Sequence, residues 1–132
     1  MATDKALLDT FDKILQYLNG HNFSEQSWKP MDPLLDDNVI IKKFDEPGYL
    51  KGKAAVKTYF LYGNGKSYLP SCWTRKKDVQ IVGNNGFISG FADSVEATTN
   101  PPSPPQTVAY SATFSEATGI WKMISVWGSC WP

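Results

Sequence analysis

The feature that most constrains this fold is a series of four long strand-like segments in the second half of the chain. The segments lie near residues 72–82, 87–97, 107–115 and 120–131. The two turns after the first and third segments are short enough for hairpins, so we expect antiparallel strands paired in sequence order. Only residues 98–106 form a longer connection, whose prolines predict a stiff loop or pocket rim, with an SH3-type ligand as the alternative.

The first half of the chain has helical spacing instead. In residues 4–19 apolar residues recur at intervals of three and four, which predicts an amphipathic helix capped by Thr3 and stopped by Gly20. Residues 38–44 predict a strand that forms a first hairpin through a Glu-Pro-Gly-Tyr turn. Residues 51–62 then return to helical spacing and predict a further helix.

A short helix is expected between these elements. Ser24 can cap a helix that carries Trp28. Pro30 and Pro33 lack amide donors and restrict the residues before them, so this helix should be short or broken.

Size and charge limit the function classes. The 132 residues predict one domain over residues 1–132, and 13 basic residues balance 13 acidic ones. Arg75 is the single arginine, which argues against nucleic acid as a partner. No apolar run is long enough to span a membrane and the first residues do not resemble a signal peptide, so we expect a cytoplasmic protein without membrane contacts.

The sequence offers little for metal or nucleophile chemistry. His21 is the single histidine, and Cys72 and Cys130 are far apart. A zinc site needs ligands with short spacing, so we expect no metal, no cofactor and two free thiols.

Four stretches carry a resemblance to a known superfamily: residues 17–23, 34–39, 52–56 and 119–125. Their positions and polarity, with the order of elements, resemble the nuclear transport factor two-like superfamily, particularly its SnoaL-like members. The resemblance implies an α+β cone, in which a curved antiparallel sheet wraps around about three N-terminal helices and encloses an apolar pocket. It also implies a homodimer formed through the sheet.

Strand alternation predicts which side chains face the helices. In the second strand the bulkier face should turn inward, with Phe87, Ser89, Phe91, Asp93 and Val95. The inward residues of the third strand should be Val108, Tyr110, Ala112 and Phe114. Those of the fourth strand should be Trp121, Met123, Ser125, Trp127, Ser129 and Trp131, while Ile124 and Val126 lie on the exposed face.

Asp93 is the sharpest catalytic candidate, because a carboxylate among apolar neighbours is costly unless it is paired, hydrogen-bonded or protonated. We expect Asp93 to act as acid or base, with Tyr110 and Ser125 orienting the substrate. The expected ligand-binding residues are Phe91, Phe114, Trp121, Met123, Trp127, Tyr59 and Trp28.

These residues favour a small-molecule pocket protein, acting on a small cyclic or aromatic metabolite as a cofactor-free isomerase, cyclase or dehydratase. The acid, base and tyrosine of ketosteroid isomerase do not carry over. The position of the tyrosine falls near Ile14, that of the base near Lys42 or Lys43, and that of the acid near Tyr110 or Ser111. The alternative is a non-catalytic ligand-binding or assembly domain of the same fold.

Overall fold

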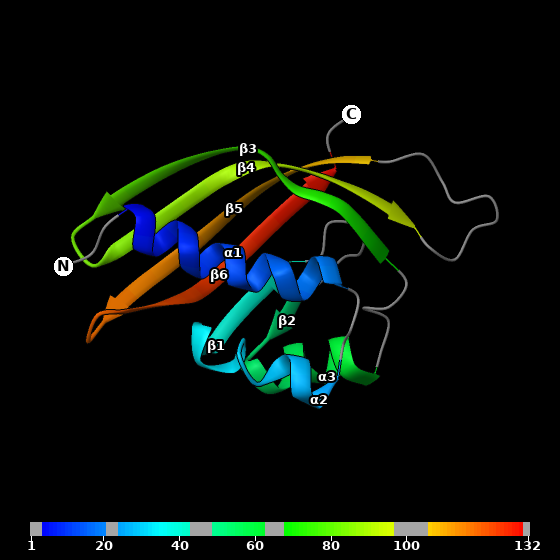
Figure 1. The fold of residues 1–132 in the computed structure, drawn as a ribbon, viewed down its shortest axis with the longest axis horizontal. Helices are drawn as coiled ribbons and strands as arrows, with labels where there is room; N and C mark the ends of the chain where they lie inside the picture. Colours follow the sequence, from blue (N-terminus) through cyan, green and yellow to red (C-terminus); the bar gives the residue numbers. More distant parts are fainter. Residues whose placement is uncertain (1–3, 21–23, 43–48, 63–67, 97–105, 131–132) are drawn as a thin grey trace.

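The structure is a computed structural model, which describes residues 4–20, 24–42, 49–62, 68–96 and 106–130. Within these ranges the backbone alone is described for residues 18–20, 60, 62, 68–77, 92–96, 106–108 and 128–130. Three helices and a 3-10 turn pack against a curved six-stranded sheet (Figure 1). The fold is therefore α+β, as the sequence predicts.

Helix α1 (Asp4–Gly20) has the predicted amphipathic pattern. Its apolar residues Leu7, Phe11, Ile14 and Leu15 are buried, because their spacing of three and four places them on one side of the helix. Figure 1 shows α1 lying across strands of the sheet, so this side of the helix supplies one layer of the core.

Helix α2 (Glu25–Trp28) is a single turn, as the prolines predict. The Ser27 backbone N–H donates to Ser24 Oγ (3.2 Å), and the Ser24 backbone N–H donates to Ser27 Oγ (2.9 Å). This reciprocal cap satisfies two amide donors at the start of the helix. The 3-10 helix η1 (Asp32–Leu34) follows, with a proline in its first turn.

Strands β1 (Leu35–Lys42) and β2 (Tyr49–Lys51) form the predicted antiparallel hairpin. Helix α3 (Lys53–Tyr62) begins two residues later than the predicted start at position 51. The reason is Gly52, whose φ of +91° separates the strand from the helix and suits a residue without a side chain.

The four remaining strands are β3 (Tyr68–Val82), β4 (Asn85–Glu96), β5 (Gln106–Ala117) and β6 (Ile120–Cys130). They pair antiparallel in sequence order, as predicted from the turns. Thr118 and Gly119 both have positive φ, the conformation favoured in two-residue hairpins. Strand β3 begins earlier than predicted and has register shifts near Pro70 and Cys72.

The complete sheet order is β2-β1-β6-β5-β4-β3. Strand β1 joins the edge of β6 in parallel, a pairing that the local sequence does not predict. We call the face that α1 covers the inner face and the opposite face the outer face. Helices α2 and α3 lie together near β1 and β2 in Figure 1, below α1 in this view.

Candidate functional site

The described part of the inner face is filled by aromatic side chains. The Phe11 ring of α1 lies 5.7 Å from the Tyr110 ring and 5.9 Å from the Phe114 ring, measured between centroids. The second contact is edge to face, a favourable geometry for aromatic pairs. All three side chains are buried. Helix α1 therefore covers the sheet surface around Phe114, a residue that was expected to line an apolar pocket.

Two glycines flank Tyr110 on the inner face. In the sheet register Tyr110 has Gly90 of β4 on one side and Gly128 of β6 on the other. Directly opposed residues of neighbouring strands place their side chains on the same face. Two glycines therefore leave Tyr110 without a large cross-strand neighbour, whereas the next inward residue, Ala112, lies between Ile88 and Val126.

The predicted inner face of β4 is wrong. Ile88 is fully buried, Ser89 is exposed, and Gly86 touches the helix layer. A Cβ at Gly86 would lie 2.6 Å from Leu7 Cδ2 and 3.1 Å from Trp121 Cζ3. The helix thus packs on the face with the small residues, because glycine permits its close approach, and Phe87 and Phe91 belong to the other face.

Asp93 pairs with Thr107 in the register of β4 and β5, but its side chain lies outside the described residues. The same holds for the side chains of Cys72 and Cys130. His21 and the proline-rich residues 101–105 also fall outside the described ranges. The predicted catalytic role of Asp93 therefore stays a hypothesis.

A β-bulge in β6 reverses the predicted faces of its second half. Met123 opposes Phe114, but Ser125 opposes Thr113, so β6 carries one extra residue at Ile124. Trp121 and Met123 are buried on the inner face as predicted. Beyond the bulge the alternation shifts by one residue.

Trp127 consequently lies on the outer face. It opposes Ser111, the neighbour of Tyr110 in β5, and 45% of its surface is exposed. The prediction that Ser125 and Trp127 share a face with Trp121 is therefore wrong. Val126, expected on the exposed face, packs against the core instead.

Trp127 forms part of an exposed aromatic patch, which we define as Tyr49, Trp127, Lys42 and Lys51. The Tyr49 and Trp127 rings are 5.2 Å apart and nearly perpendicular, at 68°. Lys42 lies between them in the register, opposing Tyr49 on one side and Trp127 on the other. Lys51 Nζ lies 5.7 Å from the centre of the Tyr49 ring, a cation–π contact.

Tyr49 was predicted to lie in a turn and not at a site, but it belongs to β2. The signal was the short alternation Tyr49-Leu50-Lys51, in which Leu50 packs against the core while its neighbours are exposed. Three residues are too few to indicate a strand without knowledge of the adjacent strand. The patch therefore depends on pairing between β2, β1 and β6.

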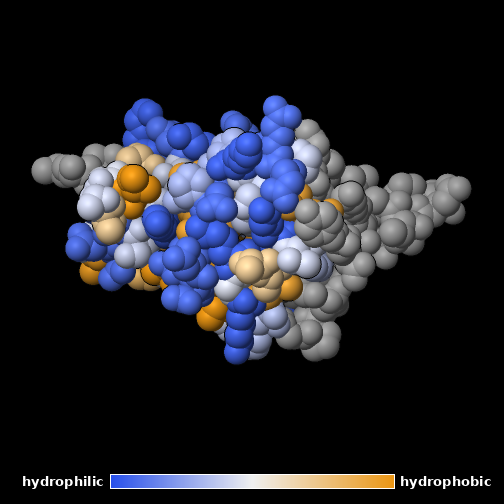
Figure 2. All heavy atoms as spheres, turned by 90° about the horizontal axis from the view of Figure 1, so that it is seen from below, coloured by the Kyte–Doolittle hydropathy of each residue, from blue (hydrophilic) through white to orange (hydrophobic). Residues whose placement is uncertain are grey.

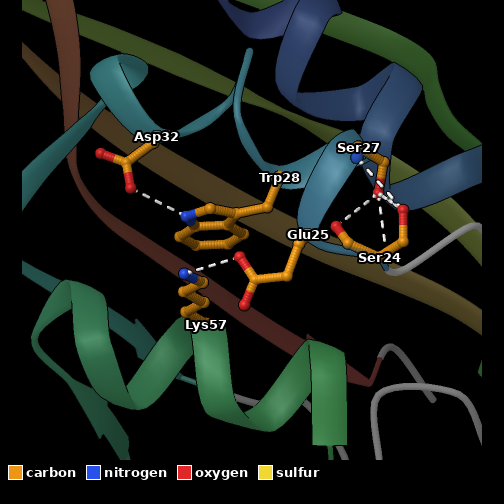
Figure 3. Close-up of polar contacts among 6 residues, drawn as sticks. All are labelled: Ser24, Glu25, Ser27, Trp28, Asp32 and Lys57. Carbon is orange, nitrogen blue, oxygen red and sulfur yellow. Dashed lines mark hydrogen bonds and ion pairs between the residues drawn. The ribbon is translucent and has the colours of Figure 1, made fainter.

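A polar cluster lies around α2 and α3 (Figure 3). Trp28 Nε1 donates to Asp32 Oδ2 at 2.8 Å, and Lys53 Nζ donates to Asp32 Oδ1 at 3.0 Å. These hydrogen bonds, from Lys53 first and Trp28 second, hold the pKa of Asp32 below its ordinary value. Lys53 also pairs with Asp37 at 3.3 Å, so one lysine of α3 joins two acidic residues.

The same cluster includes an ion pair between Lys57 Nζ and Glu25 Oε2 at 3.0 Å. The Trp28 ring meets Tyr17 edge to face at 5.8 Å. Burial, together with the negative charge of Glu25, raises the pKa of the Tyr17 hydroxyl to about 12. The expectation that Trp28 binds ligand stays a prediction; its contacts with Asp32 and Tyr17 join α2 to η1 and α1.

Tyr59 of α3 is half-buried, as is Phe91 of β4. Among the residues whose side chains the structure describes, no group of three histidine, cysteine or acidic residues could hold a metal ion. In the same described residues, no helix is both long and apolar enough to cross a membrane.

No sequence model of a protein family matches the chain, and no curated protein sequence matches it either. Solved structures do match over nearly its whole length. The hub domain of calcium/calmodulin-dependent kinase II (CaMKII) from S. rosetta has a TM-score of 0.76 and 17% identity, covering 99% of both chains. A candidate association domain of the same kinase type from Xanthomonas campestris has a TM-score of 0.76 and 13% identity, covering 100% of this chain and 90% of its own.

A candidate dehydratase of the NTF2-like family from Streptomyces avermitilis has a TM-score of 0.73 and 13% identity. The alignment covers 97% of this chain and 95% of that one. The chain has the nuclear transport factor two-like fold. Such low identities establish the architecture and not an activity.

Within this nuclear transport factor two-like fold, the predicted site residues separate into two groups. Tyr110, Phe114, Trp121 and Met123 belong to the inner face and are buried. Trp127, beyond the bulge, belongs to the outer face with Tyr49. The fold therefore offers two candidate surfaces, the inner face around Tyr110 and the aromatic patch.

Proposed function

We propose that the chain is an assembly domain that associates with copies of itself through the outer face of the sheet. The observation that carries this proposal is the aromatic patch. Trp127 and Tyr49 are 45% and 48% exposed, although large aromatic side chains contribute most when they are buried. Aromatic residues that lie together on a surface are typical of the centres of protein interfaces.

The inner face supports the same proposal. Phe11 of α1 fills the space over Phe114 and reaches the Tyr110 ring, so these residues pack as a core. Their burial leaves the outer face as the described sheet surface available to a partner.

The surface around α2 and α3 has a different character. Figure 2 shows the molecule from the side on which these helices lie in Figure 1, and hydrophilic residues predominate there. Hydrophobic residues on this side are scattered, which is ordinary for a solvated surface. We therefore assign association to the sheet and not to this side.

The structural comparisons agree with an assembly role. Two of the similar structures are described as a hub and an association domain of a protein kinase. This likeness concerns the fold, so it makes self-association a reasonable expectation here without identifying a kinase or any other attached domain.

The oligomeric state tests the proposal. We expect light scattering after size-exclusion chromatography to give a dimer or larger oligomer at micromolar concentration. Trp127→Ala should shift the protein towards the monomer. Ile120→Ala is the matched control, because Ile120 is similarly exposed, at 49%, but lies at the hairpin end of the same strand. A wild-type monomer at about 100 µM would refute the proposal, since stable association requires micromolar or tighter affinity.

A small-molecule pocket is the second candidate, and the two glycines beside Tyr110 favour it. A small apolar or aromatic molecule would lie against Tyr110 as the substrate of a cofactor-free isomerase, cyclase or dehydratase. Asp93 is not included as acid or base, because the regular register of β4 and β5 gives it the strand face of Ser89, opposite to that of Tyr110. One similar structure is described as a candidate dehydratase, and SnoaL-like membership belongs to this proposal. Ser125 is not included, because the bulge places it opposite Thr113.

Ligand binding tests the second candidate separately. A set of cyclic and aromatic compounds should raise the melting temperature of the wild-type protein. Gly90→Val should remove binding by filling the space beside Tyr110. Unchanged binding in Gly90→Val would argue against a ligand at this position.

A further inference from the structure

The four residues of the aromatic patch carry hydrogen-bond donors and no carboxylate. Trp127 has an indole N–H, Tyr49 has a hydroxyl, and Lys42 and Lys51 have ammonium groups. The rings of Trp127 and Tyr49 are 5.2 Å apart and nearly perpendicular, so they form a corner of apolar ring faces with donor groups around it. A partner that fits this corner should be apolar, rich in hydrogen-bond acceptors and poor in donors.

The chain contains a run with this chemistry, Pro101-Pro102-Ser103-Pro104-Pro105. Proline has no backbone N–H, so Ser103 supplies the one amide donor of the run. Such a sequence favours the polyproline II helix, which makes no internal hydrogen bonds and leaves its carbonyl oxygens available as acceptors. Because this helix has three residues per turn, it places Pro101 and Pro104 on one side and Ser103 on another. One side of the run is therefore apolar and bordered by acceptors.

Resting on the self-association proposed above, we propose that the aromatic patch of one copy binds residues 101–105 of another copy. Aromatic-lined surfaces are the usual receptors for proline-rich segments in the polyproline II conformation. Proline rings pack on the faces of Trp127 and Tyr49, and the carbonyl oxygens of the run accept hydrogen bonds from the indole N–H and the lysines. The stiffness of the run lowers the entropy that is lost on binding. The prolines then act as a ligand, the alternative to the stiff loop that their sequence predicts.

The run of the same copy is too short to cover the patch. Residues 97–105 connect β4 to β5 and start and end at one end of the sheet, because these strands are antiparallel neighbours. Trp127 opposes Ser111, which lies about 17 Å along β5 from Gln106, and Tyr49 lies about 14 Å further across three strands. A connection that returns to its start reaches at most about 17 Å, since its middle residue is five positions from Gln106. Only its tip can come level with Trp127, so the run that occupies the patch belongs to another copy.

A contact between a patch and a segment is heterologous, because the two surfaces that meet are different. In a two-fold contact, by comparison, the same surface meets itself. A copy that lacks the patch can therefore still donate its segment, and a copy that lacks the segment can still accept one. Mixing two such variants should restore association, which a symmetric interface would not do.

Complementation tests the proposal. The first variant is Trp127→Ala, and the second replaces four prolines by alanine, at Pro101, Pro102, Pro104 and Pro105. Each variant alone should have a dissociation constant at least about tenfold above that of the wild type, as expected when the anchor of an interface is removed. An equimolar mixture at about 100 µM should form a 1:1 complex, measured by sedimentation equilibrium. Far-UV circular dichroism would confirm that each variant is folded.

A synthetic peptide of residues 98–107 tests the contact directly. The receptor is the four-alanine variant, whose patch is intact and which has no proline run of its own to compete. In isothermal titration calorimetry, adding Trp127→Ala should weaken peptide binding at least about tenfold. Trp127→Phe should weaken it about fivefold, because it keeps an aromatic ring but lacks the N–H donor. Val82→Ala is the matched control and should bind normally, because Val82 is 55% exposed but lies on β3, three strands from β6.

The two proposals fail in different ways. If the wild type is a monomer at about 100 µM, self-association fails and this inference fails with it. If the wild type associates and Trp127→Ala dissociates it, but the four-alanine variant associates as the wild type does, only the role of residues 101–105 is refuted. A mixture that stays monomeric, or a peptide whose affinity Trp127→Ala leaves unchanged, would refute that role too. If Trp127→Ala does not fold, Tyr49→Ala takes its place, because Tyr49 supplies the other ring of the corner.

Discussion

The close contact between α1 and β4 gives the sharpest test of the inner face. We consider Gly86→Ala, because an added Cβ would lie 2.6 Å from Leu7 Cδ2, 3.2 Å from Leu7 Cδ1 and 3.1 Å from Trp121 Cζ3. Leu7 is fully buried and Trp121 nearly so. Neither side chain can turn into solvent to make room, so the end of the Leu7 side chain must repack within the core.

Overpacking of this kind costs about 1–3 kcal/mol. The lower backbone entropy of alanine in a strand offsets about 0.5–1 kcal/mol of that loss. We therefore expect the free energy of unfolding to fall by about 1–2 kcal/mol in Gly86→Ala, measured by urea denaturation. Ser89→Ala, in the same strand but on the exposed outer face, should stay within about 0.5 kcal/mol of the wild type.

A double-mutant cycle with Leu7→Ala identifies the cause. Leu7→Ala alone should cost about 2–5 kcal/mol, because it leaves a cavity beneath α1. In that background Gly86→Ala should be neutral or stabilising, since the new methyl group enters the cavity. An equal loss in both backgrounds would show that Leu7 does not pack on Gly86, and would refute this account of the inner face.

Three other predictions concern the cluster around α2. The ionised carboxylate of Asp32 contributes to the free energy of unfolding above its ordinary pKa of 3.8, and this contribution is lost as pH falls through the lower pKa of the folded protein. Asp32→Asn should remove this contribution. The difference in unfolding free energy between variant and wild type should therefore narrow in acid, and a constant difference would contradict it. The wild type should lose stability as pH rises from 10 towards about 12, because the raised pKa of Tyr17 stabilises the folded protein only while its hydroxyl is protonated. Tyr17→Phe should not show this loss. Absorbance titration of the tyrosines should show one late-ionising group that is missing from this variant. Ser24→Ala should cost about 1 kcal/mol, whereas Ser24→Asn should largely retain the cap, as urea denaturation would show.

The elements that the sequence predicts well are specified by nearby residues. The spacing of apolar residues predicted α1, and Ser24 with the prolines predicted the short α2. The pairing of β3 with β4 and of β5 with β6 followed from turn length, because a short turn joins adjacent antiparallel strands. In contrast, the parallel pairing of β1 with β6 joins segments about 80 residues apart, and no local pattern indicates it.

The inner face of β4 shows why bulk alone is a poor guide. Phe87 and Phe91 suggested the core face, but the helix packs on Gly86 and Ile88. A helix axis approaches a sheet most closely where side chains are small, so glycines can indicate the buried face as well as large residues do. Recognising this requires the path of α1, which depends on tertiary contacts.

The bulge at Ile124 has a larger consequence for function than the inner face of β4 does. With strict alternation, Trp127 would be a pocket residue beside Tyr110, and the protein would look like a small-molecule enzyme. One extra residue moves Trp127 to the outer face and brings Gly128 beside Tyr110 instead. A single bulge thus replaces a large inner-face residue by a small one and creates the aromatic patch. The alternation of residues in the sequence does not show where such a bulge lies.

The two candidate functions can be separated because β5 contributes adjacent residues to opposite faces. Tyr110 belongs to the inner face and Ser111 to the outer face. Ser111→Arg places a bulky charge beside Trp127 on the outer face, through which self-association is proposed, and leaves the inner face unchanged. Gly90→Val fills the space beside Tyr110 and leaves the aromatic patch unchanged. If Ser111→Arg produces a folded monomer that still binds a small molecule, the pocket works without assembly. If it abolishes both, the pocket requires the dimer, because the outer face is too far through the sheet for the arginine to touch Tyr110 directly.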